Sequence, residues 1–139
     1  MSEKMYEVKI GDSVEKYPAG TVFGEIALAH QDEYAQQILL VTEDGRLREL
    51  HKQLKKNCRV EFVLADSQIG RSTIHRSLNL LLLKAFYDEC GKDLRQIKLN
   101  FSISNAFYYT VKGKVELCEE LLARVKSRMQ KLVKKKVPI

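Results

Sequence analysis

Side chains that could bind a metal or act as nucleophiles are scattered along this sequence. The candidates are His30, His51, His75, Cys58, Cys90 and Cys118. Zinc needs three or four nitrogen and sulfur ligands, and structural sites draw cysteines from Cys-x-x-Cys pairs, which this sequence lacks. We therefore expect no metal site and no disulfide framework. The histidines are predicted to be ordinary surface or capping residues, and the cysteines buried free thiols.

The sequence also lacks the glycine-rich motif that P-loop enzymes use for phosphoryl transfer. A Gly-x-x-x-x-Gly-Lys-Ser/Thr loop needs two glycines five residues apart, because its backbone amides cradle the phosphates. The glycines stand at positions 11, 20, 24, 45, 70, 91 and 113, and no two are separated by five. Ser77 lacks the Gly-x-Ser-x-Gly elbow of a nucleophilic serine. The chain itself is predicted to be non-catalytic, with no cofactor of its own.

Charge is distributed unevenly along the 139 residues. The net charge is +6, but residues 1–66 hold 9 Lys/Arg against 12 Asp/Glu, whereas residues 67–139 hold 15 against 6. This split favours two modules and places a polyanion-facing surface in the second half. A basic run without acidic residues after Glu120 comprises Arg124, Lys126, Arg128, Lys131, Lys134, Lys135 and Lys136. It is either the solvated face of a helix or a contact for RNA or nucleotide phosphates.

Aromatic residues near the second half's cations add a binding hypothesis. In Phe107-Tyr108-Tyr109, strand alternation places the first and third side chains on one face and Tyr108 on the other. At least one aromatic is predicted to be core, and an exposed tyrosine beside cations could stack a nucleic-acid base. The candidate ligand- or RNA-binding residues are therefore Arg76, Tyr108, Tyr109, Lys112, Arg124, Arg128, Lys131 and Lys135.

The first half reads as a small sheet with one helix. The predicted elements are a hairpin over 6–17, a helix over 22–30 capped by Thr21, strands over 38–41, 46–50 and 59–63, and a helical turn at Leu54. The inner face of the helix is predicted to be Val22, Phe23, Ile26 and Ala27. A helix on one face of a small mixed sheet is a β-grasp, or ubiquitin-like, pattern.

The second half predicts a helix-strand-strand-helix unit. Its elements are a helix over 72–89 closed near Gly91, strands over 97–101 and 106–111, and an amphipathic helix whose inner stripe is Cys118, Leu122, Val125, Met129 and Leu132. The chain is thus predicted to be α+β, with domains over 1–65 and 66–139. Modules of about 60 residues are marginally stable, which leaves room for an oligomer. No apolar run reaches the ~20 residues of a membrane span, so a cytosolic protein is the default.

Particular motifs resemble known modules. Residues 5–64 look like a TGS domain in Ile10-Gly-Asp-Ser-Val14, in Tyr17-Pro-Ala-Gly-Thr21 and in Asp44-Gly-Arg46 with Leu47 and Leu50. Residues 66–139 resemble the start of the domain that follows TGS in threonyl-tRNA synthetases. That likeness rests on Ile74-His-Arg-Ser77, on Asn105-Ala-Phe-Tyr-Tyr109 and on a basic helix ending in Val137-Pro-Ile139.

The resemblance implies three alternative functions. The pairing is similar to the N-terminal region of a bacterial uridine kinase-like family, which implies a regulatory role and a P-loop kinase domain, with ATP and Mg, after Ile139. The alternative is a tRNA-type RNA-binding module related to threonyl-tRNA synthetase. The third is a residual editing domain, but the synthetase's His-x-x-x-His pair is broken: His75 is followed by Asn79, and an alignment on Ser77 gives Arg76 and Leu80.

Overall fold

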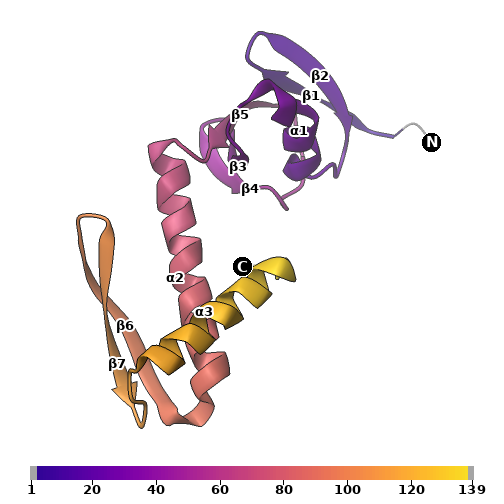
Figure 1. The fold of residues 1–139 in the computed structure, drawn as a ribbon. Helices are drawn as coiled ribbons and strands as arrows, with labels where there is room; N and C mark the ends of the chain where they lie inside the picture. Colours follow the sequence, from indigo (N-terminus) through magenta and orange to yellow (C-terminus); the bar gives the residue numbers. More distant parts are fainter. Residues whose placement is uncertain (1–2, 138–139) are drawn as a thin grey trace. The chain divides into compact units, whose positions relative to one another are not determined.

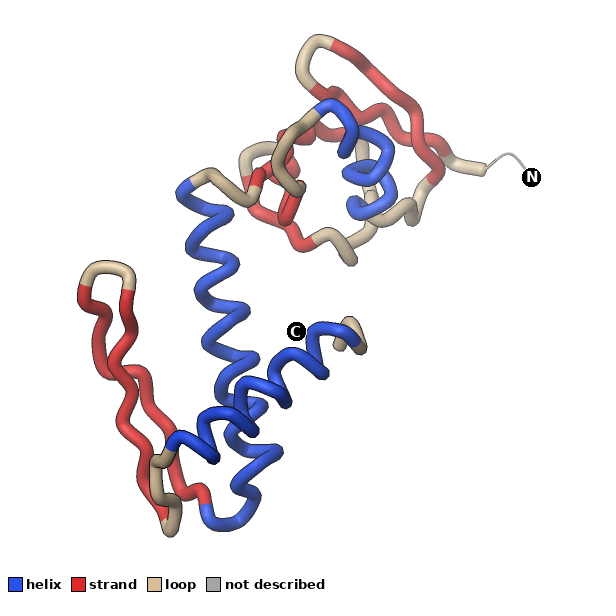
Figure 2. Tube along the Cα trace, viewed as in Figure 1, coloured by secondary structure: helices blue, strands red, loops and turns tan. Residues whose placement is uncertain are grey.

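The computed structural model describes residues 3–137 and has an α+β fold (Figures 1 and 2). It divides into two compact units, Met1–Ile74 and His75–Ile139. Helix α2 (Gln68–Cys90) runs across this division, whereas the sequence places the boundary between residues 65 and 66. Pro138 and Ile139, the end of the synthetase-like motif, lie outside the described residues. Within residues 3–137, no helix is both long and apolar enough to cross a membrane.

The first unit is a mixed five-stranded sheet with one helix. Its strands are β1 (Met5–Ile10), β2 (Ser13–Pro18), β3 (Ile38–Glu43), β4 (Arg46–Glu49) and β5 (Cys58–Leu64), in the order β2-β1-β5-β3-β4. β1 and β5 are parallel, and the other pairs are antiparallel. Helix α1 (Phe23–His30) contributes Phe23 and Ile26 to a core shared with the strands, in which Val8 and Val60 are fully buried.

Three local predictions for the first unit are wrong in whole or in part. Thr21 does not cap α1, because its hydroxyl donates to Pro18 O within the preceding turn, and Val22 holds the cap position. Leu54 is fully buried but lies in a loop, where its amide donates to Thr21 O and its carbonyl accepts from Gly20 N. These two bonds tie an extended segment to the start of α1, so no helical turn forms.

His30 is the third case, because only the surface alternative of its surface-or-capping prediction is wrong. It is buried, and it holds the N-cap position of the short 3₁₀ turn Gln31–Glu33. Its Nδ1 lies 2.7 Å from Glu33 Oε1 and its Nε2 lies 3.1 Å from Glu15 Oε1, while the ring packs on Phe62. Burial alone lowers the pKa of an imidazole, but the bonds to Glu15 and Glu33 outweigh it and raise the pKa of His30. The carboxylates of Glu15 and Glu33 therefore stabilise the protonated form of His30 at the edge of the core.

The second unit packs a hairpin and a helix on α2. Its further elements are β6 (Leu94–Ile103), β7 (Ala106–Gly113) and α3 (Glu119–Lys134), with a short 3₁₀ turn over Gly91–Asp93. The core contains Ala85 and Phe86 from α2, Ile97 from β6 and Val125 from α3. Helix α2 therefore contacts both the hairpin and α3 through its C-terminal half.

The start of α2 and the buried stripe of α3 differ from prediction. Helix α2 begins at Gln68 rather than Ser72, because Ser67 Oγ accepts from Gly70 N at 3.0 Å and caps it. In α3, Leu121 is buried and Leu122 is exposed, the reverse of the predicted stripe. Helical spacing fits either leucine, and the packing against α2 selects the first. Of the cysteines, Cys58 is buried, whereas Cys90 and Cys118 are half-buried.

Candidate nucleic-acid interface

An extra residue in β6 decides which side chains share each face of the β6–β7 hairpin. Leu99 pairs with Tyr109, but the next pair is Phe101 with Tyr108, so Asn100 is a bulge with no residue opposite it in the register, although its side-chain amide donates to Thr110 Oγ1. Simple alternation predicts Ile97, Leu99 and Phe101 on one face. The bulge instead turns Phe101 to the opposite face, beside Tyr108.

Phe101 and Tyr108 form an exposed aromatic pair. Their rings stack with centroids 4.9 Å apart and planes 7° from parallel, and the residues are 50% and 54% exposed. This face, called the outer face below, points away from α2, because Ile97 and Val111 of the same hairpin belong to the core packed on α2. Lys98 and Thr110, which pair with each other, share the outer face with the aromatic pair. Water-exposed stacked rings of this kind can accept a further flat ring.

The inner face of the hairpin is occupied by packing contacts with α2. Phe107 meets His75 edge-on with centroids 5.4 Å apart, and the Tyr109 hydroxyl donates to Asn79 Oδ1. Burial raises the pKa of Tyr109. His75 and Asn79 are the positions at which the sequence retains one imidazole of a His-x-x-x-His pair, and both are engaged by aromatic residues. Among residues 3–137, no group of three or more His, Cys, Asp or Glu side chains is placed to hold a metal.

A basic hollow of about 720 Å³ lies where the hairpin strands leave and return to the core. This hairpin-base hollow is lined by Lys92, Asp93, Arg95, Lys112, Gly113 and Lys114. Four cations face one carboxylate there, for a formal charge of +3. Lys112 is on the outer face with Tyr108, because the two residues are four apart on one strand. The outer face therefore extends from the positively charged hairpin-base hollow to the Phe101–Tyr108 pair.

The predicted cations of α3 divide into two kinds. Arg128 Nε lies 2.9 Å from Asp88 Oδ2, and Arg124 Nε lies 3.9 Å from Glu89 Oε2, so both arginines join α3 to α2. The hydrogen bond from Lys84, and then that from Arg128, lower the pKa of Asp88. Lys131 and Lys135 are exposed and form no ion pair within the described part of the chain, as is also true of Arg76. Ion pairs with α2 therefore account for Arg124 and Arg128 without a ligand.

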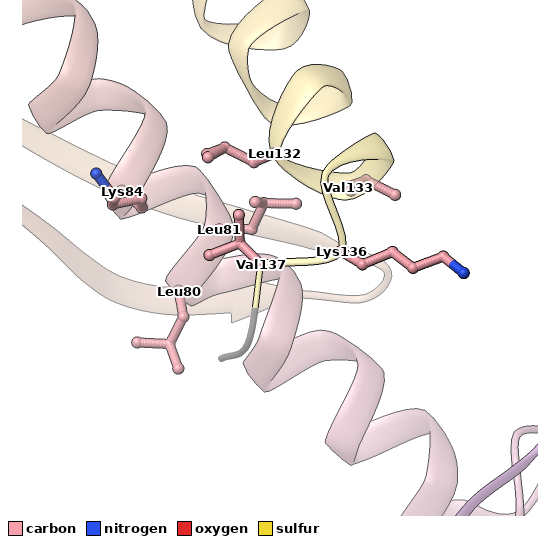
Figure 3. A pocket seen from close by; sticks show the side chains of 7 residues that line it. All are labelled: Leu80, Leu81, Lys84, Leu132, Val133, Lys136 and Val137. Atoms are coloured by element: carbon pink, nitrogen blue, oxygen red, sulfur yellow. The ribbon is translucent and has the colours of Figure 1, made fainter.

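An apolar groove separates α2 from the end of α3 (Figure 3). Its volume is about 530 Å³, and it is lined by Leu80, Leu81, Lys84, Leu132, Val133, Lys136 and Val137. Lys84 is already paired with Asp88, and Figure 3 shows the Lys136 side chain extending away from the aliphatic groups. This groove can accept an apolar group, but it offers no hydrogen-bond acceptor from a side chain and no nucleophile. It is not a candidate for polar chemistry.

The sequence named Tyr108 and Lys112 as candidate binding residues but missed the residues that share their face or line the adjoining hollow. These are Lys92, Arg95, Lys98, Phe101 and Lys114. The lysines and the arginine were detectable as two short basic clusters at the ends of the predicted strands. The bulge that exposes Phe101 leaves no mark in the sequence, because Asn100 fits regular alternation equally well.

Comparison with known proteins found no family model that matches this chain. Among curated proteins it is similar to threonine–tRNA ligases of several bacteria. It is 22% identical to that of Clostridium acetobutylicum over 139 residues, 97% of this chain and 21% of the ligase. It is 28% identical to that of Thermotoga neapolitana (91% and 20% covered) and 25% identical to that of Symbiobacterium thermophilum (100% and 21% covered). The chain spans about a fifth of the length of these relatives.

Proposed function

We propose that this chain is an RNA-binding module of the threonyl-tRNA synthetase type, and that the outer face of the β6–β7 hairpin contacts the RNA. The observation that carries this proposal is the exposed Phe101–Tyr108 pair above a basic hollow. Proteins that bind single-stranded nucleic acid combine aromatic side chains, on which bases stack, with cations that follow the backbone. Both parts lie on one face of one hairpin here.

The relatives support the class of ligand. Each is named as a ligase that joins threonine to tRNA, and the similarity extends over both units of this chain. The strand order β2-β1-β5-β3-β4 with one covering helix supports the further proposal that the first unit is a TGS-type β-grasp domain. Nothing in these relatives supports a uridine kinase as the parent protein, so the RNA-binding alternative takes precedence over the kinase prediction.

The hairpin would bind RNA at two points. Tyr108 and Lys112 are four residues apart on β7, a separation of about 13 Å at the usual rise of a strand. An unpaired base stacks on the aromatic pair, while phosphates farther along the strand lie near the hairpin-base hollow. Stacking requires a base that is free of its duplex partner, so this arrangement selects single-stranded segments or ends.

We also propose that the chain performs no chemistry on the RNA. His75 and Asn79 are engaged with Phe107 and Tyr109, and the described residues 3–137 place no group of three or more His, Cys, Asp or Glu side chains around a possible metal position. A general base must reach a reacting proton, and an imidazole packed edge-on against an aromatic ring is poorly placed to do so. Binding and positioning are therefore the functions that this unit can supply.

The test is RNA affinity of the full chain, measured by fluorescence anisotropy with a single-stranded oligoribonucleotide and with tRNA. Tyr108→Ala removes half of the aromatic pair. Because base stacking on an aromatic side chain is worth about 1–3 kcal/mol, we expect a loss of affinity of roughly 5- to 150-fold. Tyr87→Ala is the matched control, since Tyr87 is a similarly exposed tyrosine on α2.

Two further measurements make this experiment decisive. Affinity should fall with added salt, with a slope that becomes shallower when Lys112 is changed to Gln, because each phosphate contact releases counterions. A blunt duplex of the same sequence should bind more weakly than the single strand. Equal affinities of the Tyr108→Ala and Tyr87→Ala variants for single-stranded RNA would refute the proposal.

A further inference from the structure

The first unit contains a basic hollow of its own, although the charge of this half of the chain is negative. Six of the nine Lys/Arg residues within positions 1–66 lie between Arg46 and Arg59. β4 and the loop that follows it gather several of them around a hollow of about 620 Å³. This β4-loop hollow is lined by Phe23, Glu43, Arg48, His51, Lys52, Gln53, Lys55 and Lys56. Four cations face one carboxylate, for a formal charge of +3.

The loop that carries these cations is fixed by its backbone. The amide of Leu54 donates to Thr21 O at 2.8 Å, and Gly20 N donates to Leu54 O at 3.0 Å. The Leu54 side chain between Lys52 and Lys55 is fully buried in the core. The two lysines are therefore mounted on a loop whose position is already set, which reduces the entropy lost when a ligand binds.

Two of the four cations are held by carboxylates. Arg48 donates through Nε to Glu43 Oε2 at 2.9 Å, and the Glu43 side chain is nearly buried. A guanidinium has five N–H donors, so this single bond orients Arg48 and leaves its terminal nitrogens available. Lys56 is paired with Asp44 at 2.5 Å. Lys52 and Lys55 have no ion pair among residues 3–137 and are the free charges of the hollow.

The start of α1 does not supply the positive character of this hollow. Its first amides are already used, because Phe23 N donates to Lys52 O and Gly24 N donates to Leu50 O. The carbonyls of Leu50 and Lys52 thus satisfy the first amides of α1, and the Lys52 side chain is exposed. The positive potential comes from side chains alone, and a small set of substitutions can remove it.

We infer that the β4-loop hollow is a phosphate-binding site, with Lys52, Lys55 and the terminal nitrogens of Arg48 as its contacts and His51 as a further polar group. Its volume falls within the range of small-molecule sites, and its lining fits a multiply charged anion better than an apolar ligand. The phosphates belong either to a free nucleotide or to an RNA strand. This site is independent of the hairpin in the second unit.

The test uses the full chain, labelled with ¹⁵N, and inorganic tripolyphosphate as the probe. Saturable shifts are expected at amides in positions 48–56. The double variant Lys52→Gln, Lys55→Gln should raise the dissociation constant at least about tenfold, because two charge-assisted contacts are lost. Its control is Lys126→Gln, Lys134→Gln, which removes the same charge from exposed positions of α3 and should change the constant little.

Competition then identifies the source of the phosphate. Displacement of tripolyphosphate by a nucleoside triphosphate, but not by an oligoribonucleotide, assigns the site to free nucleotides, and the reverse result assigns it to RNA. Tyr108→Ala should leave tripolyphosphate binding unchanged, so failure of the hairpin proposal and failure of this one are separable. Absence of saturable shifts at 48–56, or equal weakening in both double variants, would overturn the inference.

Discussion

At the scale of single residues, His30 is the clearest case of a side chain whose charge state is set by its neighbours. Its pKa is raised in the folded chain by Glu15 and Glu33. A group with a raised folded pKa stabilises the fold fully below its unfolded pKa of about 6.5, and this contribution is lost as the pH rises through the folded value. The first unit should therefore become less stable as the pH rises from the unfolded pKa through the higher folded pKa of His30.

We expect the free energy of unfolding of the first unit to fall as the pH rises above about 6.5, with a slope no steeper than about 1.4 kcal/mol per pH unit for one proton. His30→Gln should remove this dependence, because the amide does not titrate there. Urea unfolding followed by circular dichroism at several pH values measures it. Cys58 does not contribute to this pH dependence near neutrality, since burial raises the pKa of its thiol to about 11. Parallel pH profiles for the two proteins would contradict the assignment.

At the scale of elements, Gly113 determines how β7 ends. Its φ is +142°, and a Cβ there would lie 2.2 Å from Asp93 O and 2.8 Å from Arg95 N. Lys114 N donates to the same carbonyl at 2.8 Å. The close approach holds the two sides of the hairpin-base hollow together, so a side chain at this position would force them apart.

Gly113→Ala should therefore destabilise the second unit by about 3 kcal/mol, from the clash and the unfavourable φ together. Gly91→Ala is the comparison: Gly91 also has a positive φ, of +53°, but nothing lies within 4 Å of the position that an alanine methyl group would take there. We expect it to cost only about 1 kcal/mol. Thermal unfolding of the two variants measures the difference, and similar losses would show that backbone conformation, not crowding, matters at Gly113.

Elements were easier to predict from the sequence than the details that position side chains. Strand alternation from Tyr6 to Ile10 and helical spacing from Ile74 to Phe86 gave the right element types, because one face of each is buried. The bulge at Asn100, the loop at Leu54 and the choice of Leu121 over Leu122 depend on tertiary contacts. The β4-loop hollow was not predicted for another reason. The net charge of the first half is negative, and such a sum conceals a local cluster of positive side chains. The β-grasp assignment and the 65/66 boundary stay predictions.

At the scale of the whole molecule, the two units have separate cores. One core cluster draws on residues between Tyr6 and Phe62, and the other on residues between Leu82 and Met129. Ile26 is buried in the first and Ile97 in the second, which gives an equivalent probe for each.

We expect Ile26→Val and Ile97→Val each to cost about 0.5–1.5 kcal/mol, and each to act on its own unit. Amide hydrogen exchange resolves the two effects: the first variant should accelerate exchange in β1 and β5, and the second in β6 and α3. Acceleration throughout the chain in either variant would show that the units unfold as one.

The two-stranded form of the β6–β7 sheet affects the tendency of the protein to aggregate in solution. Each strand has a partner on one side only, and residues 99–111 contain no charged residue. Such an open ribbon is a template on which further copies can add as strands and grow into fibrils. Lys98 and Lys112 flank the uncharged stretch and act as gatekeepers against this growth. Neutralising them would therefore make the protein aggregate sooner in storage, besides weakening the proposed contact with RNA.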